Sequence, residues 1–139
     1  MVVPNVTPDT PPLRKNPVFA YGQDAFVRPN PFRPDVAVAI DAVIDKKIRG
    51  LDAHTSQMYE WLPWVDGELE SVPADPAARL AWLRQQRSGK PIADDVRAAL
   101  RKWYGAKADV VKDAEAFEIC EYGRRPSESD LRRLFPFFD

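Results

Sequence analysis

Histidine and cysteine are scarce in this chain of 139 residues, which has one of each. Cys120 has no partner for an internal disulfide, so a reducing compartment fits best and we expect a cytoplasmic protein. A zinc site needs at least three protein ligands, and no cysteine or histidine stands near Cys120 at ligand spacing. We therefore predict no metal site and no catalytic residue within the chain.

Long runs of one chemical type are also missing. Twenty basic and twenty-one acidic side chains give a formal net charge of -1, and without a polybasic run nucleic acid is not an expected partner. No stretch reaches the roughly 18 apolar residues that a membrane span requires, and the first residues show no basic segment followed by an apolar one. We expect neither a membrane span nor an export signal.

The composition is that of a folded protein, with 45% hydrophobic and 29% charged residues. Eight of the fourteen prolines precede Asp35, which predicts an extended arm over residues 1–35 with room for one short strand within residues 16–26. The run V-A-V-A-I at 36–40 predicts a strand buried on both faces, as in a parallel or mixed sheet.

A single long amphipathic helix is predicted over residues 41–62, ended by Pro63, because apolar residues recur at helical spacing. These are Ile44, Ile48, Leu51, Met58 and Leu62. On such a helix Lys47, Leu51, His54 and Met58 share one stripe, with Gln57 beside it.

Residues 64–139 are predicted to form a helical and strand extension. Asp75-Pro76 favours a helix start, Val96, Leu100 and Trp103 mark a second helix, and the alternation within 114–123 indicates a half-exposed strand. Ser127 is expected to cap a helix over 128–134, and the apolar tail from Phe135 to Phe138 is expected to dock on a surface. The prediction is one partial α/β domain divided at 1–35, 36–63 and 64–139.

Three stretches together resemble a known family. The first is N-P-V-F-A-Y-G-Q-D-A-F followed by P-N-P-F-R-P-D-V-A-V-A-I, and the third is A-F-E-I-C-E-Y-G-R-R-P-S with L-R-R-L-F-P-F. In the second, Lys47, Leu51, His54, Ser56 and Gln57 match a helix pattern K-x-x-A-L-x-x-H-x-S-Q, with Gly50 in place of alanine. These stretches resemble the C-terminal part of the LmbE-like, or PIG-L type, N-acetylglucosaminyl deacetylases.

The resemblance implies a fragment of a Rossmann-like deacetylase sandwich, with the long helix and added C-terminal helices and strand. In the complete family enzyme a zinc-activated water attacks the acetamide of an N-acetylated amino-sugar conjugate. The A-H-P-D-D-E and H-x-D-H motifs that hold that zinc are absent from this chain. We therefore expect it to be inactive alone, with a missing N-terminal half supplied from elsewhere, and homo-oligomerisation is a further possible partnership.

The resemblance also implies that Gln57 and His54 line the substrate pocket. Competing interpretations are a core or boundary role for His54 and an ordinary surface role for Ser56 and Gln57. Trp61 and Trp64 suit either a sugar-stacking platform or the closure of a core, and we predict the second. Cys120 is interpreted as a small buried hydrophobe.

Two other functions are alternatives to the deacetylase hypothesis. The chain would act as a protein-interaction adaptor if its proline-rich arm and aromatic tail bound a partner. It would instead be a metal-less relative if it held sugar through Gln57 without hydrolysing it.

Overall fold

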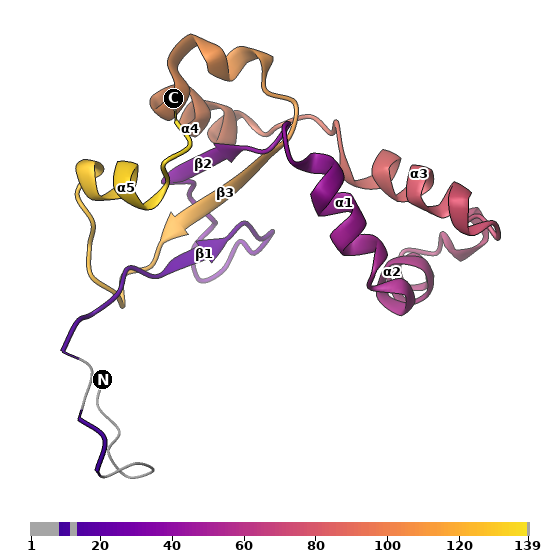
Figure 1. Cartoon of the computed structure of the whole chain (residues 1–139), viewed down its shortest axis with the longest axis horizontal. Coiled ribbons are helices and arrows are strands. Elements are labelled where there is room, and N and C mark those ends of the chain that lie inside the picture. Colours follow the sequence, from indigo (N-terminus) through magenta and orange to yellow (C-terminus); the bar gives the residue numbers. More distant parts are fainter. Residues whose placement is uncertain (1–8, 12–13, 139) are drawn as a thin grey trace.

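The structure is a computed structural model that describes residues 9–11 and 14–138, and it confirms the mixed α/β class. In the described residues a three-stranded sheet combines with five α-helices, and Figure 1 shows α1 to α3 grouped beyond the end of the sheet at which β2 leads into α1, away from α5. The strands are β1 (Ala20–Gly22), β2 (Val36–Ala39) and β3 (Ala114–Ile119). The helices are α1 (Ile44–Asp52), α2 (Leu62–Val65), α3 (Pro76–Arg87), α4 (Asp94–Tyr104) and α5 (Glu128–Leu134).

The sheet has the order β1-β3-β2, so the last strand in the sequence lies at its centre. Tyr21 pairs with Glu118 and Ala37 pairs with Ala116, both in antiparallel register. The three predicted strands are confirmed, each shorter than its predicted range. The prediction of a parallel or mixed sheet is wrong for the described strands, because the apolar run of β2 reports burial on both faces and carries no information about strand direction.

Proline dominates the arm before β2, as the sequence predicts. Positions 1–8 and 12–13 of the predicted arm lie outside the described residues. From residue 14 to residue 35 the chain forms bends and the short strand β1, without a helix. The missing N–H groups and fixed φ of the prolines explain this irregular path.

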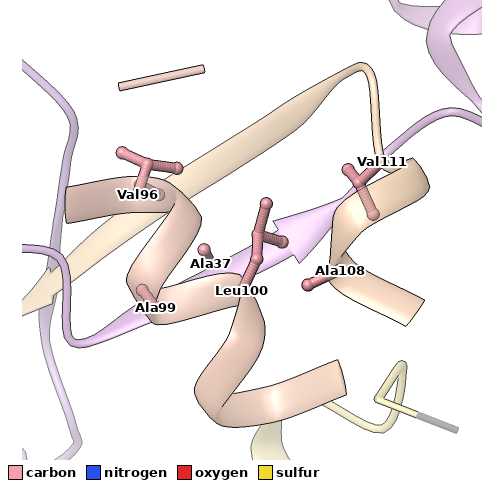
Figure 2. Close-up of a cluster of buried hydrophobic side chains, with 7 residues drawn as sticks. Ala37, Val96, Ala99, Leu100, Ala108 and Val111 are labelled. Carbon is pink, nitrogen blue, oxygen red and sulfur yellow. The ribbon is translucent and has the colours of Figure 1, made fainter. Parts of the chain in front are cut away.

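Small side chains allow α4 to pack closely on one face of the sheet. Ala37 and Ala116 face Leu100, and all three are almost completely buried, as Figure 2 shows for Ala37 and Leu100. The 3-10 turn η3 (Gly105–Val110) adds Ala108 to the same cluster. Burial of a leucine such as Leu100 contributes about 1.5 to 3 kcal/mol.

Two aromatic side chains of α4 form hydrogen bonds with backbone groups at the outer edge of β2. The indole Nε1 of Trp103 donates to the backbone oxygen of Asp35 at 3.0 Å. The backbone N–H of Ala39 donates to the Tyr104 hydroxyl at 3.2 Å. An open strand edge invites pairing with another chain, so these two bonds remove a site of edge-to-edge association.

The C-terminal tail docks on the chain, as its apolar character predicts. Phe138 stacks on Trp103 with ring centroids 4.7 Å apart, and Phe135 lies 5.6 Å from the ring of Phe117. Phe137 is the exception, since 58% of it is exposed.

A separate apolar cluster joins α1 and α3. Ile44, Ile48, Met58, Tyr59 and Leu83 are buried together, and Ile40 connects them to the end of β2. The α3 helix begins as predicted, since a carboxylate oxygen of Asp75 accepts the backbone N–H of Ala78 at 2.9 Å. An ion pair between Asp45 and Arg84 links the two helices at the surface.

The end of α3 is tied back to the sheet through Asp113, which precedes β3. Its carboxylate accepts the Ser88 hydroxyl at 3.1 Å and the backbone N–H of Gly89 at 2.9 Å. Gly89 has a φ of 65°, in the left-handed region where a side chain would be strained. The segment from α1 to α3, which we call the α1–α3 lobe, is therefore connected to the sheet at both of its ends, through Ile40 at its start and through Asp113 at its end.

The prediction of one long helix over residues 41–62 is wrong. The helix α1 ends at Asp52, His54 donates its N–H to the Leu51 oxygen at 2.9 Å, and the His54 oxygen accepts from Met58 at 2.9 Å. A π-helical turn η1 (Gln57–Trp61) and α2 follow this break. Apolar spacing persists across the break, because both pieces pack on the same cluster, so the periodicity alone conceals it.

Pro63 does not end a helix, in contrast to the prediction. It stands in the first turn of α2, where its missing N–H needs no partner. The N–H of Leu62 donates to the Gln57 oxygen five residues earlier, which closes the π turn immediately before the proline.

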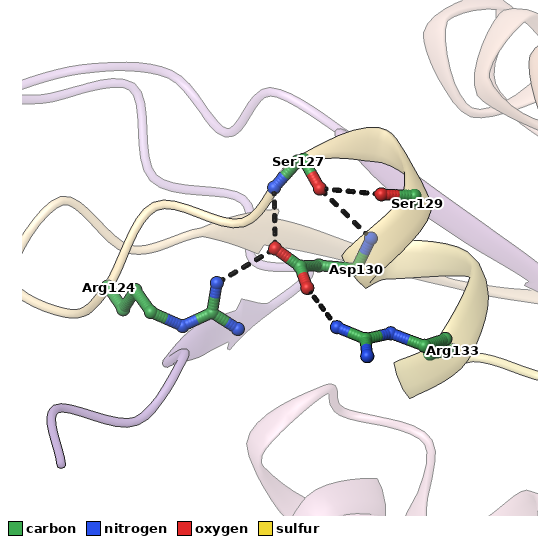
Figure 3. A network of polar contacts seen from close by, with 5 residues as sticks. All are labelled: Arg124, Ser127, Ser129, Asp130 and Arg133. Carbon is green, nitrogen blue, oxygen red and sulfur yellow. Dashed lines mark hydrogen bonds and ion pairs between the residues drawn. The ribbon is translucent and has the colours of Figure 1, made fainter.

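The α5 helix confirms both its predicted range and its cap. Figure 3 shows the Ser127 hydroxyl accepting the Asp130 N–H while the Asp130 carboxylate accepts the Ser127 N–H, each at 3.1 Å. Arg124 donates to the same carboxylate at 2.8 Å, and Arg133 also pairs with it. The bond from Arg124 first, then those from Ser127 and Arg133, hold the pKa of Asp130 well below its ordinary value.

This low pKa predicts a loss of stability in acid that depends on Asp130. The folded state takes up a proton on the Asp130 carboxylate less readily than the unfolded state. The stabilisation that this carboxylate provides is therefore complete above about pH 5 and falls as the pH drops further. Urea unfolding at pH 7 and at pH 3 is expected to show a smaller acid-induced decrease in Asp130→Asn than in the wild type. Equal decreases in the two proteins would contradict this assignment.

Candidate functional site

The segment after the helix break presents polar and aromatic side chains on its solvent side. Met58 and Tyr59 are buried, so the positions on the opposite side of this segment face outward. Together with the 3-10 turn η2 (Leu69–Ser71), they form an open groove of about 610 Å³. Its lining residues are Ser56, Gln57, Glu60, Trp61, Trp64 and Leu69.

Two exposed tryptophans line this groove. Trp61 is 56% exposed and Trp64 is 67% exposed. The prediction that this pair closes a core is therefore wrong. The signal that identifies them is the spacing from Gln57, since positions 57, 61 and 64 lie on one helical face, opposite the buried Tyr59.

Tyr59 holds the π turn in place from its buried side. Its hydroxyl donates to a carboxylate oxygen of Asp52, at the end of α1, over 2.5 Å. Its ring lies 6.1 Å from that of Trp82, with the Arg79 guanidinium 5.4 Å from the ring centroid. Burial first, and then the bond to Asp52, raise the pKa of Tyr59 to about 12. The groove thus stands on a buried and hydrogen-bonded base.

The two residues predicted to bind substrate occupy different places. Gln57 lines the groove beside Ser56 and Trp61, with its side chain exposed. His54 is exposed at the helix break, where its backbone oxygen accepts the N–H of Gln57 at 3.1 Å. It does not line the groove. The structure therefore assembles Gln57 with residues that sequence reasoning assigned elsewhere, Trp61 and Trp64, and with Glu60 and Leu69, which it did not single out.

Cys120 lies far from this groove in the fold, after β3. Its side chain is buried, in agreement with its interpretation as a small hydrophobe, and its Sγ is hydrogen-bonded to the Tyr21 hydroxyl at 3.0 Å. This bond, followed by burial, raises the pKa of Tyr21 to about 12.

The residues present do not fit a zinc ion. Across residues 9–11 and 14–138, no three His, Cys, Asp or Glu side chains come together in a group able to hold a metal. In the same part of the chain, no helix combines the length and apolar character needed to cross a membrane.

Fluorescence quenching tests the exposure of the groove. Trp64→Phe is expected to lower the fraction of tryptophan emission that acrylamide can quench, because it removes the more exposed indole of the groove. Trp82→Phe is the matched control and is expected to raise that fraction, since Trp82 is half-buried. An accessible fraction that stays unchanged or rises in Trp64→Phe would contradict the exposed position of this side chain.

Comparison with known proteins does not add an assignment. No family model matches the chain, and neither a curated protein nor a solved structure shows significant similarity to it.

Proposed function

We propose that this chain is the C-terminal portion of a zinc-dependent deacetylase acting on N-acetylglucosamine-type conjugates, and that the groove around Gln57 binds the sugar. The observation that carries the proposal is the pair of exposed indoles beside an amide in one groove. The resemblance of residues 47–57 to the helix pattern of LmbE-like deacetylases supplies the reaction class.

Sugar rings match the chemistry of this groove. A pyranose presents a face of C–H groups and a rim of hydroxyls. It can therefore stack on an exposed aromatic ring while its hydroxyls bond to polar side chains beside that ring. Trp61 and Trp64 offer the aromatic rings, while the Gln57 amide can both donate and accept hydrogen bonds. Ser56 adds a hydroxyl at the same end of the groove. A purely apolar ligand would leave these polar groups without partners.

The chain's own contribution to such an enzyme is binding and orientation. Because the described residues lack a zinc ligand set, the metal and the water that it activates must be supplied by other sequence. The role proposed for Gln57 is to hold the sugar in place. Correct placement of a substrate accounts for a large share of catalysis in general.

The adaptor alternative has less support in the structure. Phe135 and Phe138 of the tail pack against Phe117 and Trp103 within the chain, so they are occupied. Phe137 is the exposed aromatic of the tail. The groove, by contrast, is open and holds two exposed indoles.

Sugar titration tests the role of Gln57. The wild-type chain is expected to bind the β-1,4-linked dimer of N-acetylglucosamine, and Gln57→Ala to bind it about two- to tenfold more weakly, as loss of one hydrogen bond implies. Isothermal titration calorimetry measures both affinities. Gln23→Ala serves as the matched control, since Gln23 is an exposed amide outside the groove. Equal affinity in wild type and Gln57→Ala, or no binding by the wild type, would contradict the proposed sugar site.

The deacetylase assignment has its own test. Genomic sequence immediately upstream of the codon for Met1 is expected to encode an in-frame A-H-P-D-D-E segment, because the family's zinc ligands are missing from this chain. A stop codon directly upstream, together with intact sugar binding, would reject the deacetylase and leave a metal-less sugar-binding relative.

A further inference from the structure

A second groove adjoins the first and shares Trp64 and Leu69 with it. Its volume is about 850 Å³, and it runs from η2 to α3. Glu68, Glu70 and Trp82 contribute to its lining, along with Gln85 and Gln86. The two grooves therefore form one continuous surface that contains three indoles, which we name the tryptophan surface.

The charges of the tryptophan surface all have one sign. Glu60 lines the first groove, and Glu68 and Glu70 line the second. No lysine or arginine within the described part of the chain lines either groove. The surface is therefore acidic, although the chain as a whole has a formal net charge of only -1.

These three carboxylates also lack internal partners. Elsewhere Asp109 pairs with Arg101, and Glu115 pairs with Lys47. Among the described residues, Glu60, Glu68 and Glu70 form no ion pair, and all three are exposed. The surface thus offers three carboxylates that form no ion pair with any lysine or arginine of the described residues.

Indole rings and carboxylates both favour cationic ligands. The face of an aromatic ring carries negative potential and attracts cations, and nearby carboxylates strengthen that attraction. A neutral sugar gains the stacking contact alone, whereas a sugar with an ammonium group gains stacking and charge attraction together. An anionic ligand would be repelled.

We infer that the tryptophan surface binds amino sugars with free ammonium groups more tightly than their N-acetylated forms. This inference rests on the proposed function and names the state of the sugar that the surface prefers. Hydrolysis of the acetamide consumes one water and yields acetate and an amine, and the amine takes up the proton released by the acid. The surface therefore attracts the cationic sugar product and repels the acetate.

Two adjoining grooves also fit more than one sugar unit. Trp64 stands where they meet, with Trp61 on one side and Trp82 on the other. A chain of β-1,4-linked units can place successive rings along this row, so a partly deacetylated oligosaccharide is the expected ligand class.

Calorimetry with the full chain tests this preference. The probes are the β-1,4-linked dimers of glucosamine and of N-acetylglucosamine, each titrated at low and at high salt near neutral pH. The glucosamine dimer is expected to bind about three- to tenfold more tightly at low salt, the size that exposed cation–π and ion-pair contacts produce together. This advantage is expected to shrink at high salt, because exposed charges are screened.

Substitution of the carboxylates identifies the source of the preference. The combined Glu60→Gln and Glu70→Gln variant is expected to show a clearly smaller preference for the glucosamine dimer than the wild type, because only Glu68 and the indole rings then remain to attract the ammonium groups. Both residues are exposed, so the variant is expected to keep the melting temperature of the wild type. Glu121→Gln is the matched control, because Glu121 is an exposed acid outside both grooves, and it is expected to retain the preference.

The outcomes separate this inference from the proposed function. Equal binding of the two dimers by the wild type, tighter binding of the N-acetylated dimer, or a preference in the combined variant as large as in the wild type would overturn the inference alone. Binding of neither dimer would overturn both proposals. Binding of tetralysine as tightly as the glucosamine dimer would also overturn the inference, since it would show a surface for basic peptides.

Discussion

The burial of Ile44, Ile48, Met58 and Tyr59 against Leu83 is the constraint on which the candidate site depends. These contacts fix which side of the chain between the helix break and Val65 faces the interior. The opposite side, with Gln57, must then face water. Each buried aliphatic side chain of this cluster contributes about 1.5 to 3 kcal/mol, so rotation of the segment about its axis would forfeit several such contributions. Two exposed indoles are the consequence of this packing.

The rest of the fold holds that lobe in place and does not enter the groove. Asp113 connects the end of α3 to the sheet, and Ile40 brings the end of β2 into the α1–α3 cluster. Trp103 and Tyr104 meanwhile seal the outer edge of β2. The sheet is therefore a support, while the lining of the first groove comes from one short stretch of the chain between Ser56 and Leu69.

Local signals in the sequence predicted much of the fold. The caps at Asp75 and Ser127 are set by hydrogen bonds within three residues, so they can be identified without tertiary information. The three strands were found for a similar reason, from short apolar or alternating runs. Strand direction was missed because pairing depends on residues that are far apart in the sequence, such as Ala37 and Ala116.

The candidate site was predicted only in part. Gln57 was identified through a family resemblance, whereas Trp61 and Trp64 were assigned to a core because large aromatic side chains are usually buried. The break at His54 was hidden for a physical reason: both helical pieces pack on one cluster and keep a common apolar spacing. Glu60, Glu68 and Glu70 gave no signal, since isolated acids on a helix or turn are ordinary surface residues.

The most direct measurement is a two-dimensional ¹H–¹⁵N spectrum of the four indole N–H groups during titration with the glucosamine dimer. The account predicts that the signals of Trp61 and Trp64 shift progressively, while that of Trp103, whose Nε1 is bonded to Asp35, stays in place. Shifts confined to Trp103, or four signals that never move at saturating sugar, would contradict a binding surface built on the exposed side of the π turn.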